Sequence, residues 1–310
     1  MSSEHPVTWG SPLSHDDDPH RPMPLEWQAY TDQVMAEWYA LLTRKPEEKE
    51  VQEFLERHPA MVPGGSGDVG PGGHHGSDMG ALFRQPTLQG AGRTFTPDFM
   101  WVTRSSSLIT PILVEIEKPD KRWFTSAGRP TAQFTEAHDQ LAQWRDWFRQ
   151  DGNAAIFRQR FQLLGDRYPE RLLTPHFVLV YGRQSEFEHG GGHSDADALN
   201  RKRDSIRQPD EKFYTFDSLR PRFDHSQSMT INMTAEGPAL FAFSPVFGTG
   251  PSLSDGILLF DDISDALDRS AMMTEDRRNY LRQRWFSWQE SQREKLANPS
   301  QVFVRTLGRE

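Results

Sequence analysis

The stretch TPDFMWVTRSSSLITPILVEIEK, residues 96–118, decides the fold of this chain. It holds two apolar runs of strand length, 98–102 and 112–116, and both are rich in β-branched and aromatic residues. The serines at 105–107 between these runs suit a turn. The stretch therefore predicts a β-hairpin, and the rest of the chain can be placed around it.

A turn centred near residues 106–107 fixes which residues of the hairpin face each other. In an antiparallel pair the numbers of facing residues have a constant sum, so Asp98 is expected opposite Glu115. Side chains alternate between the two faces of a strand, so Glu117 shares the face of Glu115 and Lys118 points to the other face. The hairpin therefore predicts three carboxylates at one spot.

Neighbouring carboxylates repel each other unless a proton or a cation neutralises them. A hard divalent ion such as Mg²⁺ is commonly held by two or three carboxylate oxygens in phosphoryl-transfer sites. A second interpretation requires no chemistry, because acids at the end of a strand can be solvated or can protect a sheet edge against aggregation. The hairpin alone leaves both interpretations open.

Pro97-Asp98 on one strand and Glu115-Ile116-Glu117-Lys118 on the next resemble the motif of the PD-(D/E)xK nuclease superfamily. More narrowly, the chain resembles the Shedu family of bacterial anti-phage nucleases over roughly residues 45–220. Further stretches carry this resemblance: EVQEFLERHP at 50–59, AHDQ at 137–140 with Trp144, LVYGR at 179–183 and YTFDSL at 214–219. The chain departs from the superfamily pattern at Glu117, where that pattern has lysine.

The resemblance implies a metal-dependent endonuclease that hydrolyses DNA phosphodiester bonds with Mg²⁺ or Mn²⁺ in bacterial anti-phage defence. It implies that Asp98, Glu115 and Glu117 bind metal, with a glutamate of the opening helix nearby, for which Glu50 is the best match by position. It also implies that Gln140 supports the attacking water or the scissile phosphate. A non-cleaving module that keeps the nuclease fold and binds or senses nucleic acid is the alternative.

The register of one strand decides whether Glu117 or Lys118 serves the chemistry. In a regular strand Glu117 lies beside Glu115, so Glu117→Ala should cripple cleavage and Lys118→Ala should do much less. A bulge at Glu117 would turn Lys118 onto the catalytic face, where its charge could stabilise the transition state. We expect the regular strand, because no glycine marks a bulge here.

Composition limits the remaining possibilities. The chain has 310 residues, 35% hydrophobic residues, a mean hydropathy of -0.72 and no cysteine, which excludes disulfides and thiolate metal sites. It has no apolar run of membrane-spanning length and no signal pattern, so a cytoplasmic protein without a membrane partner is expected. Its formal net charge of -9 argues against a generic coat for nucleic acid, so DNA contact must be local. Two basic segments, 201–207 and 277–284, are candidates for it.

The pattern along the chain predicts an α/β fold: a PD-(D/E)xK restriction-endonuclease-like core with a mixed sheet flanked by helices, an N-terminal helix and a C-terminal helical extension. The expected parts are a disordered tail at 1–24, an N-terminal helix at 25–45, a nuclease-like domain at 46–220 with a mobile Gly-rich loop at 64–80, and an extension at 221–310. Expected strands are 82–88, 98–102, 112–116, 177–181 and 212–216, and expected helices are 131–149, 154–173, 197–206, 254–269 and 274–297.

Two segments have open roles. The loop at 119–130 carries Lys121, Arg122, Trp123 and Phe124, which either grip a nucleotide by charge and stacking or pack down as a lid. The long helix at 274–297 either packs on the domain or joins a second copy of the chain in a homo-oligomer.

Overall fold

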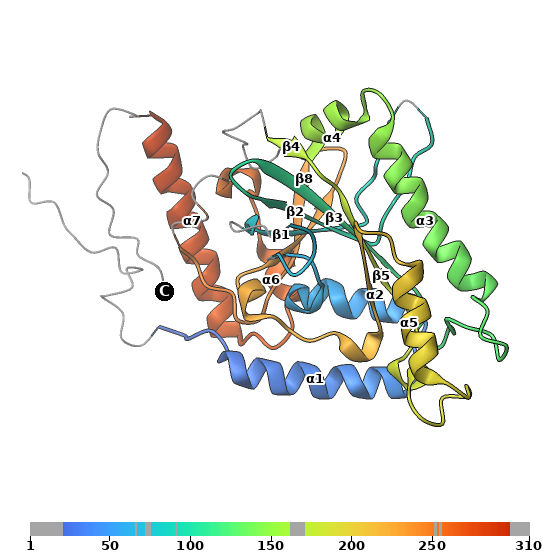
Figure 1. Ribbon diagram of the computed structural model, residues 1–310. Coiled ribbons are helices and arrows are strands. Elements are labelled where there is room, and N and C mark those ends of the chain that lie inside the picture. Colours follow the sequence, from blue (N-terminus) through green and yellow to red (C-terminus); the bar gives the residue numbers. More distant parts are fainter. Residues whose placement is uncertain are drawn as a thin grey trace, which may run out of the picture.

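The structure is a computed structural model, and it describes residues 21–65, 67–71, 76–90, 92–161, 171–250, 253 and 256–297. The described strands form one mixed sheet in the order β6-β5-β3-β2-β1-β7-β8, with β4 beside β3 (Figure 1). Their bounds are β1 Ser77–Arg84, β2 Phe99–Arg104, β3 Leu108–Ile116, β4 Leu172–Leu173, β5 His176–Val180, β6 Glu211–Tyr214, β7 Met229–Met233 and β8 Pro238–Phe243. The predicted α/β class with a mixed sheet is confirmed.

Helices cover both faces of this sheet (Figure 1). Adjacent residues of β2 point to opposite faces of the sheet. Phe99 and Trp101 pack with α1 and α2 on one face, whereas Met100 packs with α3, α4 and α7 on the other. The bounds of the α-helices are α1 Trp27–Thr43, α2 Glu48–Arg57, α3 Ala132–Arg149, α4 Asn153–Phe161, α5 Ala196–Ile206, α6 Ser264–Arg269 and α7 Glu275–Ala297. The sheet is therefore buried on both sides, as expected for its continuous apolar strands.

The hairpin forms as the sequence predicts. Phe99 faces Val114 and Arg104 faces Ile109, so facing residues of β2 and β3 have a constant sum along the whole ladder. The amide of Ser105 donates to the carbonyl oxygen of Leu108 at 3.0 Å and closes the turn. No bulge interrupts this ladder, and the next facing pair beyond Phe99 and Val114 would be Asp98 and Glu115.

Strands β3, β5 and β6 are parallel neighbours. The carboxyl ends of all three therefore lie at one edge of the sheet, where ligands bind in many α/β proteins. Helix α3 follows the hairpin and precedes the β4–β5 region, and its apolar stripe is buried: Phe134, Ala137, Leu141 and Trp144. Thr131 caps this helix, because its hydroxyl accepts a hydrogen bond from the amide of Phe134.

Three predicted elements have different bounds. The strand expected at 82–88 begins earlier, as β1, and ends at Arg84 because Gln85 adopts a φ of 43°, which no strand accommodates. The helix expected at 154–173 ends as α4 at Phe161, and Leu172–Leu173 is strand; residues 162–170 lie outside the described part. The helix expected at 254–269 is a 3₁₀ turn followed by the short α6.

The C-terminal part of the chain extends the same sheet. Strand β7 pairs in parallel with β1, and α7 buries Leu281, Trp285 and Trp288 in the core on that side. Helix α7 thus packs on the domain. The predicted basic patch at 277–284 is not a surface patch, because Arg277 is 2% exposed and Arg284 is 0% exposed. None of the described helices is long and apolar enough to cross a membrane.

Candidate active site

Acidic side chains gather where β2 begins and β3 ends. Asp98 directly precedes β2, Glu115 lies near the end of β3, and Glu117 follows that strand. The Oδ2 atom of Asp98 accepts a hydrogen bond from the amide of Ile116 at 2.8 Å, so the backbone of one strand orients the carboxylate of the other. We refer to Asp98, Glu115, Glu117 and a fourth acid, Glu48, as the acidic cluster.

Glu48 enters the cluster from the first turn of α2. It hydrogen-bonds the Glu117 side chain, and the charge of Glu48 also acts on Asp98 and Glu115. The α2 glutamate expected here from the sequence, Glu50, points elsewhere: its carboxylate accepts a hydrogen bond from the amide of Glu47 at 3.0 Å and completes a capping box. Because residues two positions apart lie on different sides of a helix, Glu48 is the α2 acid of the site and Glu50 is not.

Burial and mutual repulsion raise the pKa values of Asp98, Glu115 and Glu48. Burial is the largest cause for Asp98, followed by the charges of Glu48 and Glu117, and together they raise its pKa to about 7. The pKa of Glu115 is raised well above its usual value by burial and by the charges of Asp98, Glu117 and Glu48. The pKa of Glu48 is also raised, chiefly by burial. The folded protein therefore favours protons or a cation at this spot.

Gln140 reaches the cluster from α3. Its side chain hydrogen-bonds Glu115 and partly offsets the upward shift of that pKa. A buried carboxylate fixes this part of α3 against the sheet, because Glu211 at the start of β6 contacts His138 at 2.8 Å and Arg145 at 2.5 Å. The helix therefore holds Gln140 beside Glu115, where the resemblance places it.

Lys121 supplies a positive charge to the cluster, and sequence reasoning did not place it there. Its ammonium group pairs with the Glu117 carboxylate, and its charge partly offsets the rise in the pKa of Glu48. A turn in which the amide of Lys121 donates to the carbonyl of Lys118 at 3.1 Å brings residue 121 back towards Glu117. In the sequence, the spacing of four residues between Glu117 and Lys121 was the signal that could have indicated this pairing. Strand β3 ends at Ile116, and Lys118 beyond it contacts Glu47 at 2.9 Å.

The loop that carries Lys121 is anchored in the core. Trp123 and Phe124 are fully buried, and their backbone amides both donate to the buried Glu186 carboxylate at 2.9 Å. These two aromatic side chains therefore pack down and do not stack on a nucleotide. Lys121 and Arg122, just before them, project from a fixed backbone.

The cluster offers the oxygen donors that a hard divalent ion prefers. In the described part of the chain, however, no three acidic or histidine side chains stand ready as an ion-binding group. In this arrangement Lys121 engages Glu117, and the raised pKa values of Asp98 and Glu115 favour protons on those carboxyls. The donor atoms are of the type that Mg²⁺ or Mn²⁺ prefers, and the carboxylates would have to lose these protons and converge to hold either ion.

The raised pKa of Asp98 predicts that stability falls with rising pH. Its folded pKa of about 7 exceeds the value of 3.8 for a free carboxyl. The folded protein therefore keeps its full stability at this site below about pH 4, where Asp98 is protonated in both states, and loses stability as the pH rises through 7. This shift corresponds to roughly 4 kcal/mol of unfolding free energy. Urea unfolding at about pH 5 and pH 8 should show wild type losing more stability than Asp98→Asn. Parallel losses in both proteins would contradict the assignment.

A comparison with known families agrees with this geometry. The family model described as Shedu protein SduA, C-terminal, matches residues 45–220, which is more than half of the chain. The matched segment contains α2, the β2–β3 hairpin, α3 and the strands β5 and β6, and hence the whole acidic cluster with Gln140 and Lys121. No curated protein matches the chain significantly. The chain therefore belongs to the Shedu family.

Proposed function

We propose that the protein is a metal-dependent endonuclease of the PD-(D/E)xK type that cleaves DNA in bacterial anti-phage defence. The defence role rests on membership of the Shedu family. The observation that carries the chemistry is the acidic cluster itself: Asp98 and Glu115 meet at the carboxyl-end edge of the sheet with raised pKa values, next to Glu117, Glu48 and an amide side chain. Such a concentration of carboxyls with shifted pKa values is typical of catalytic sites.

Asp98 and Glu115 would hold Mg²⁺ or Mn²⁺, with Glu117 and Glu48 as the further carboxylates within reach. A divalent ion at this position supplies Lewis-acid polarisation of the scissile phosphate and lowers the pKa of an attacking water. Because Asp98 and Glu115 must lose their protons to become ligands, binding should release protons and become tighter as the pH rises.

The chain itself supplies the remaining functions. Gln140 can orient the attacking water through its amide group, because it already hydrogen-bonds Glu115. The ammonium group of Lys121, which pairs with Glu117, would stabilise the negative charge that develops on the phosphate during in-line attack. Lys118 is unsuited to this role, because it contacts Glu47 on the other side of the strand.

A non-cleaving nucleic-acid-binding module is the second candidate function. The observation in its favour is that Lys121 already neutralises Glu117, so part of the cluster is satisfied without any ion. In such a module the carboxylates would stay protonated or paired, and the protein would bind nucleic acid in the same way with or without divalent ions.

Cleavage assays separate the two candidates. Purified protein is incubated with linear, circular and single-stranded DNA in Mg²⁺ or Mn²⁺, and wild type is compared with Asp98→Ala. We expect products from wild type alone. Glu53→Ala is the matched control, because it removes an exposed acid of α2 that pairs with Lys49. Binding without cleavage by any of the three proteins would favour the module, and equal cleavage by all three would show that the cluster is not the active site.

A further inference from the structure

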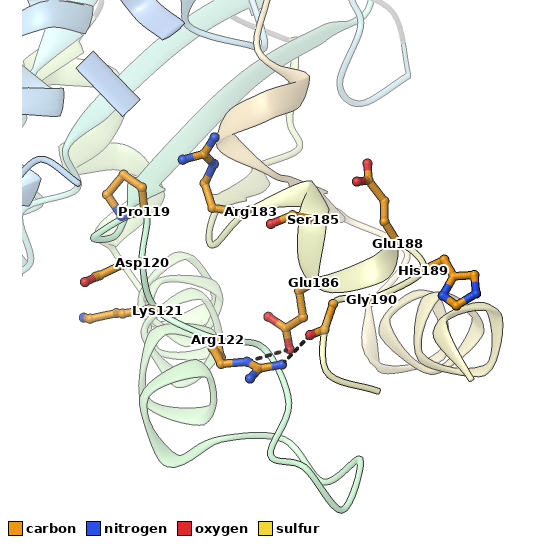
Figure 2. A pocket seen from close by; sticks show the side chains of 11 residues that line it. Pro119, Asp120, Lys121, Arg122, Arg183, Ser185, Glu186, Glu188, His189 and Gly190 are labelled. Carbon is orange, nitrogen blue, oxygen red and sulfur yellow. Dashed lines mark hydrogen bonds and ion pairs between the residues drawn. The ribbon is translucent and has the colours of Figure 1, made fainter. Parts of the chain in front are cut away.

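A polar cavity lies beside the acidic cluster. It has a volume of about 410 Å³ and is bounded by two loops, 119–122 after β3 and 183–191 after β5 (Figure 2). Because β3 and β5 are parallel neighbours, both loops leave the same edge of the sheet as the cluster. Lys121 belongs to both places, since it lines the cavity and its ammonium group pairs with Glu117.

The walls of this cavity are fixed. Glu186 of the second loop accepts hydrogen bonds from the amides of Trp123 and Phe124, which directly follow the first loop, and so ties one wall to the other. In the second loop, the amide of Gly191 donates to the carbonyl of Glu188 at 3.0 Å. A Cβ atom at Gly191 would collide with the carbonyl oxygen of Ser185, so this close folding of the rim requires glycine. The cavity is therefore preformed.

Two of the charged residues around the cavity have structural partners. Arg183 binds the carboxylate of Asp217 through Nε and Nη2 at 2.7–3.0 Å. The buried carboxylate of Glu186 contacts its two backbone donors at 2.9 Å and His193 at 3.3 Å. Among the acids of the rim, Asp120 lies 3.7 Å from Lys118, and Glu188 points away from Arg122 in Figure 2.

Arg122 has partners within the protein but keeps further N–H donors for a ligand. Its side chain is 50% exposed and reaches towards Glu186 and the glycines at the end of the 183–191 loop (Figure 2). Its Nη2 atom donates to the carbonyl of Gly191 at 2.8 Å and lies 3.0 Å from Nε2 of His193, while its Nε atom forms a long ion pair with Glu186 at 3.9 Å. A guanidinium group has five N–H donors in a planar fork that matches a phosphate. Arg122 is thus held in place with donors to spare.

We propose that this cavity is a subsite for one nucleotide of the substrate strand next to the scissile bond, with Arg122 as the ligand of its phosphate. The volume lies within the range of about 300–1,000 Å³ that small-ligand pockets span. The polar walls suit a sugar-phosphate, and Lys121 lines the cavity while it also pairs with Glu117 of the cluster. The inference rests on the proposed nuclease function, although nucleotide binding can be measured without cleavage.

The test measures binding of a short labelled DNA oligonucleotide by fluorescence anisotropy in Ca²⁺ and in EDTA, over a range of salt concentrations. Arg122→Gln should weaken binding about tenfold and lower the slope of log Kd against log salt by about one, because one phosphate contact is lost. Arg129→Gln is the matched control, since it removes the same charge from an exposed position of the same loop outside the cavity. It should change Kd by less than about twofold.

The variant Ser185→Tyr tests whether binding depends on the shape of the cavity as well as on the charge of Arg122. Ser185 is exposed at the cavity wall, so a larger side chain there should fill the cavity and leave the fold intact. We expect this variant also to weaken oligonucleotide binding. A parallel titration with a 5′-mononucleotide tells a substrate strand from a free nucleotide: weakened mononucleotide binding with unchanged oligonucleotide binding would assign the cavity to a free nucleotide and overturn the strand assignment.

The outcomes of the two proposals are distinguishable. Equal Kd values for wild type, Arg122→Gln and Ser185→Tyr would overturn the subsite, even if wild type cleaves DNA. Weaker binding by both variants in a protein that never cleaves would support the subsite and overturn the nuclease. In an active enzyme, Arg122→Gln should raise KM and leave kcat within about threefold, because the phosphate contact is the same in ground and transition states.

Discussion

Glu115→Gln should abolish cleavage and at the same time stabilise the folded protein. Glutamine keeps the size of the side chain and removes the charge that would hold a divalent ion, so we expect a loss of at least about a thousandfold in cleavage rate. The stabilisation follows from the raised pKa of Glu115, whose ionised form is disfavoured by burial and by Asp98, Glu117 and Glu48. Thermal unfolding in EDTA measures it, and the midpoint should rise by several degrees, roughly the effect of 1–2 kcal/mol.

The pH dependence of this gain gives a stricter check. The folded pKa of Glu115 is raised, so in wild type the associated stabilisation is present at acidic pH and disappears as the pH rises. The variant has no such loss, so its advantage should be large at about pH 8 and small at about pH 4. Glu53→Gln, on the outer face of α2, serves as the control. A Glu115→Gln protein that is less stable than wild type at pH 8 would contradict this electrostatic description.

Lys121→Met should lower the cleavage rate by about a hundredfold, whereas Lys118→Met should change it by less than about threefold. The two lysines are three residues apart, but only the ammonium group of Lys121 reaches the cluster, where it pairs with Glu117. Single-turnover cleavage in Mn²⁺ measures the difference. Methionine keeps the length and the apolar stem of lysine, so both variants should fold. Glu117→Ala should also cripple cleavage.

Binding of Mn²⁺ provides a second measurement of the Lys121 prediction. The ammonium group competes with an ion for the Glu117 carboxylate, so Lys121→Met should bind Mn²⁺ more tightly although it cleaves more slowly. Titration calorimetry in the absence of DNA measures this affinity. Loss of activity in Lys118→Met with full activity in Lys121→Met would show instead that the strand bulges at Glu117 when substrate binds.

The hairpin and its register were predictable because both depend on local information. Two strand-length runs and a three-serine turn leave one pairing, and that pairing places Asp98 opposite Glu115. The apolar stripe of α3 was predictable for the same reason, since its period of 3.6 residues is a property of one helix. The position of Gln140 beside Glu115 followed from the family resemblance and not from the helix pattern.

The other members of the site depend on tertiary structure. Glu48 and Glu50 both lie in the first turn of α2 but on different sides of it, and only the packing of that helix against the sheet decides which of them faces Asp98. Lys121 reaches Glu117 because Trp123 and Phe124 are drawn into the core, which fixes the preceding turn. The burial of Arg277 and Arg284 is likewise invisible in a sequence that shows only a basic run. In each case a contact between distant segments outweighs the local pattern.

The parallel pairing of β1 with β7 also affects how the chain can fold during its synthesis. Ala81 pairs with Met229, and the ribosome must add the whole segment between them before this ladder can close. Until then β1 has one satisfied edge, formed by β2, and one open row of backbone donors and acceptors. When the segment that the family model matches leaves the ribosome, one edge of β1 therefore still has unpaired backbone donors and acceptors. Strand β7, which follows that segment, pairs with this edge.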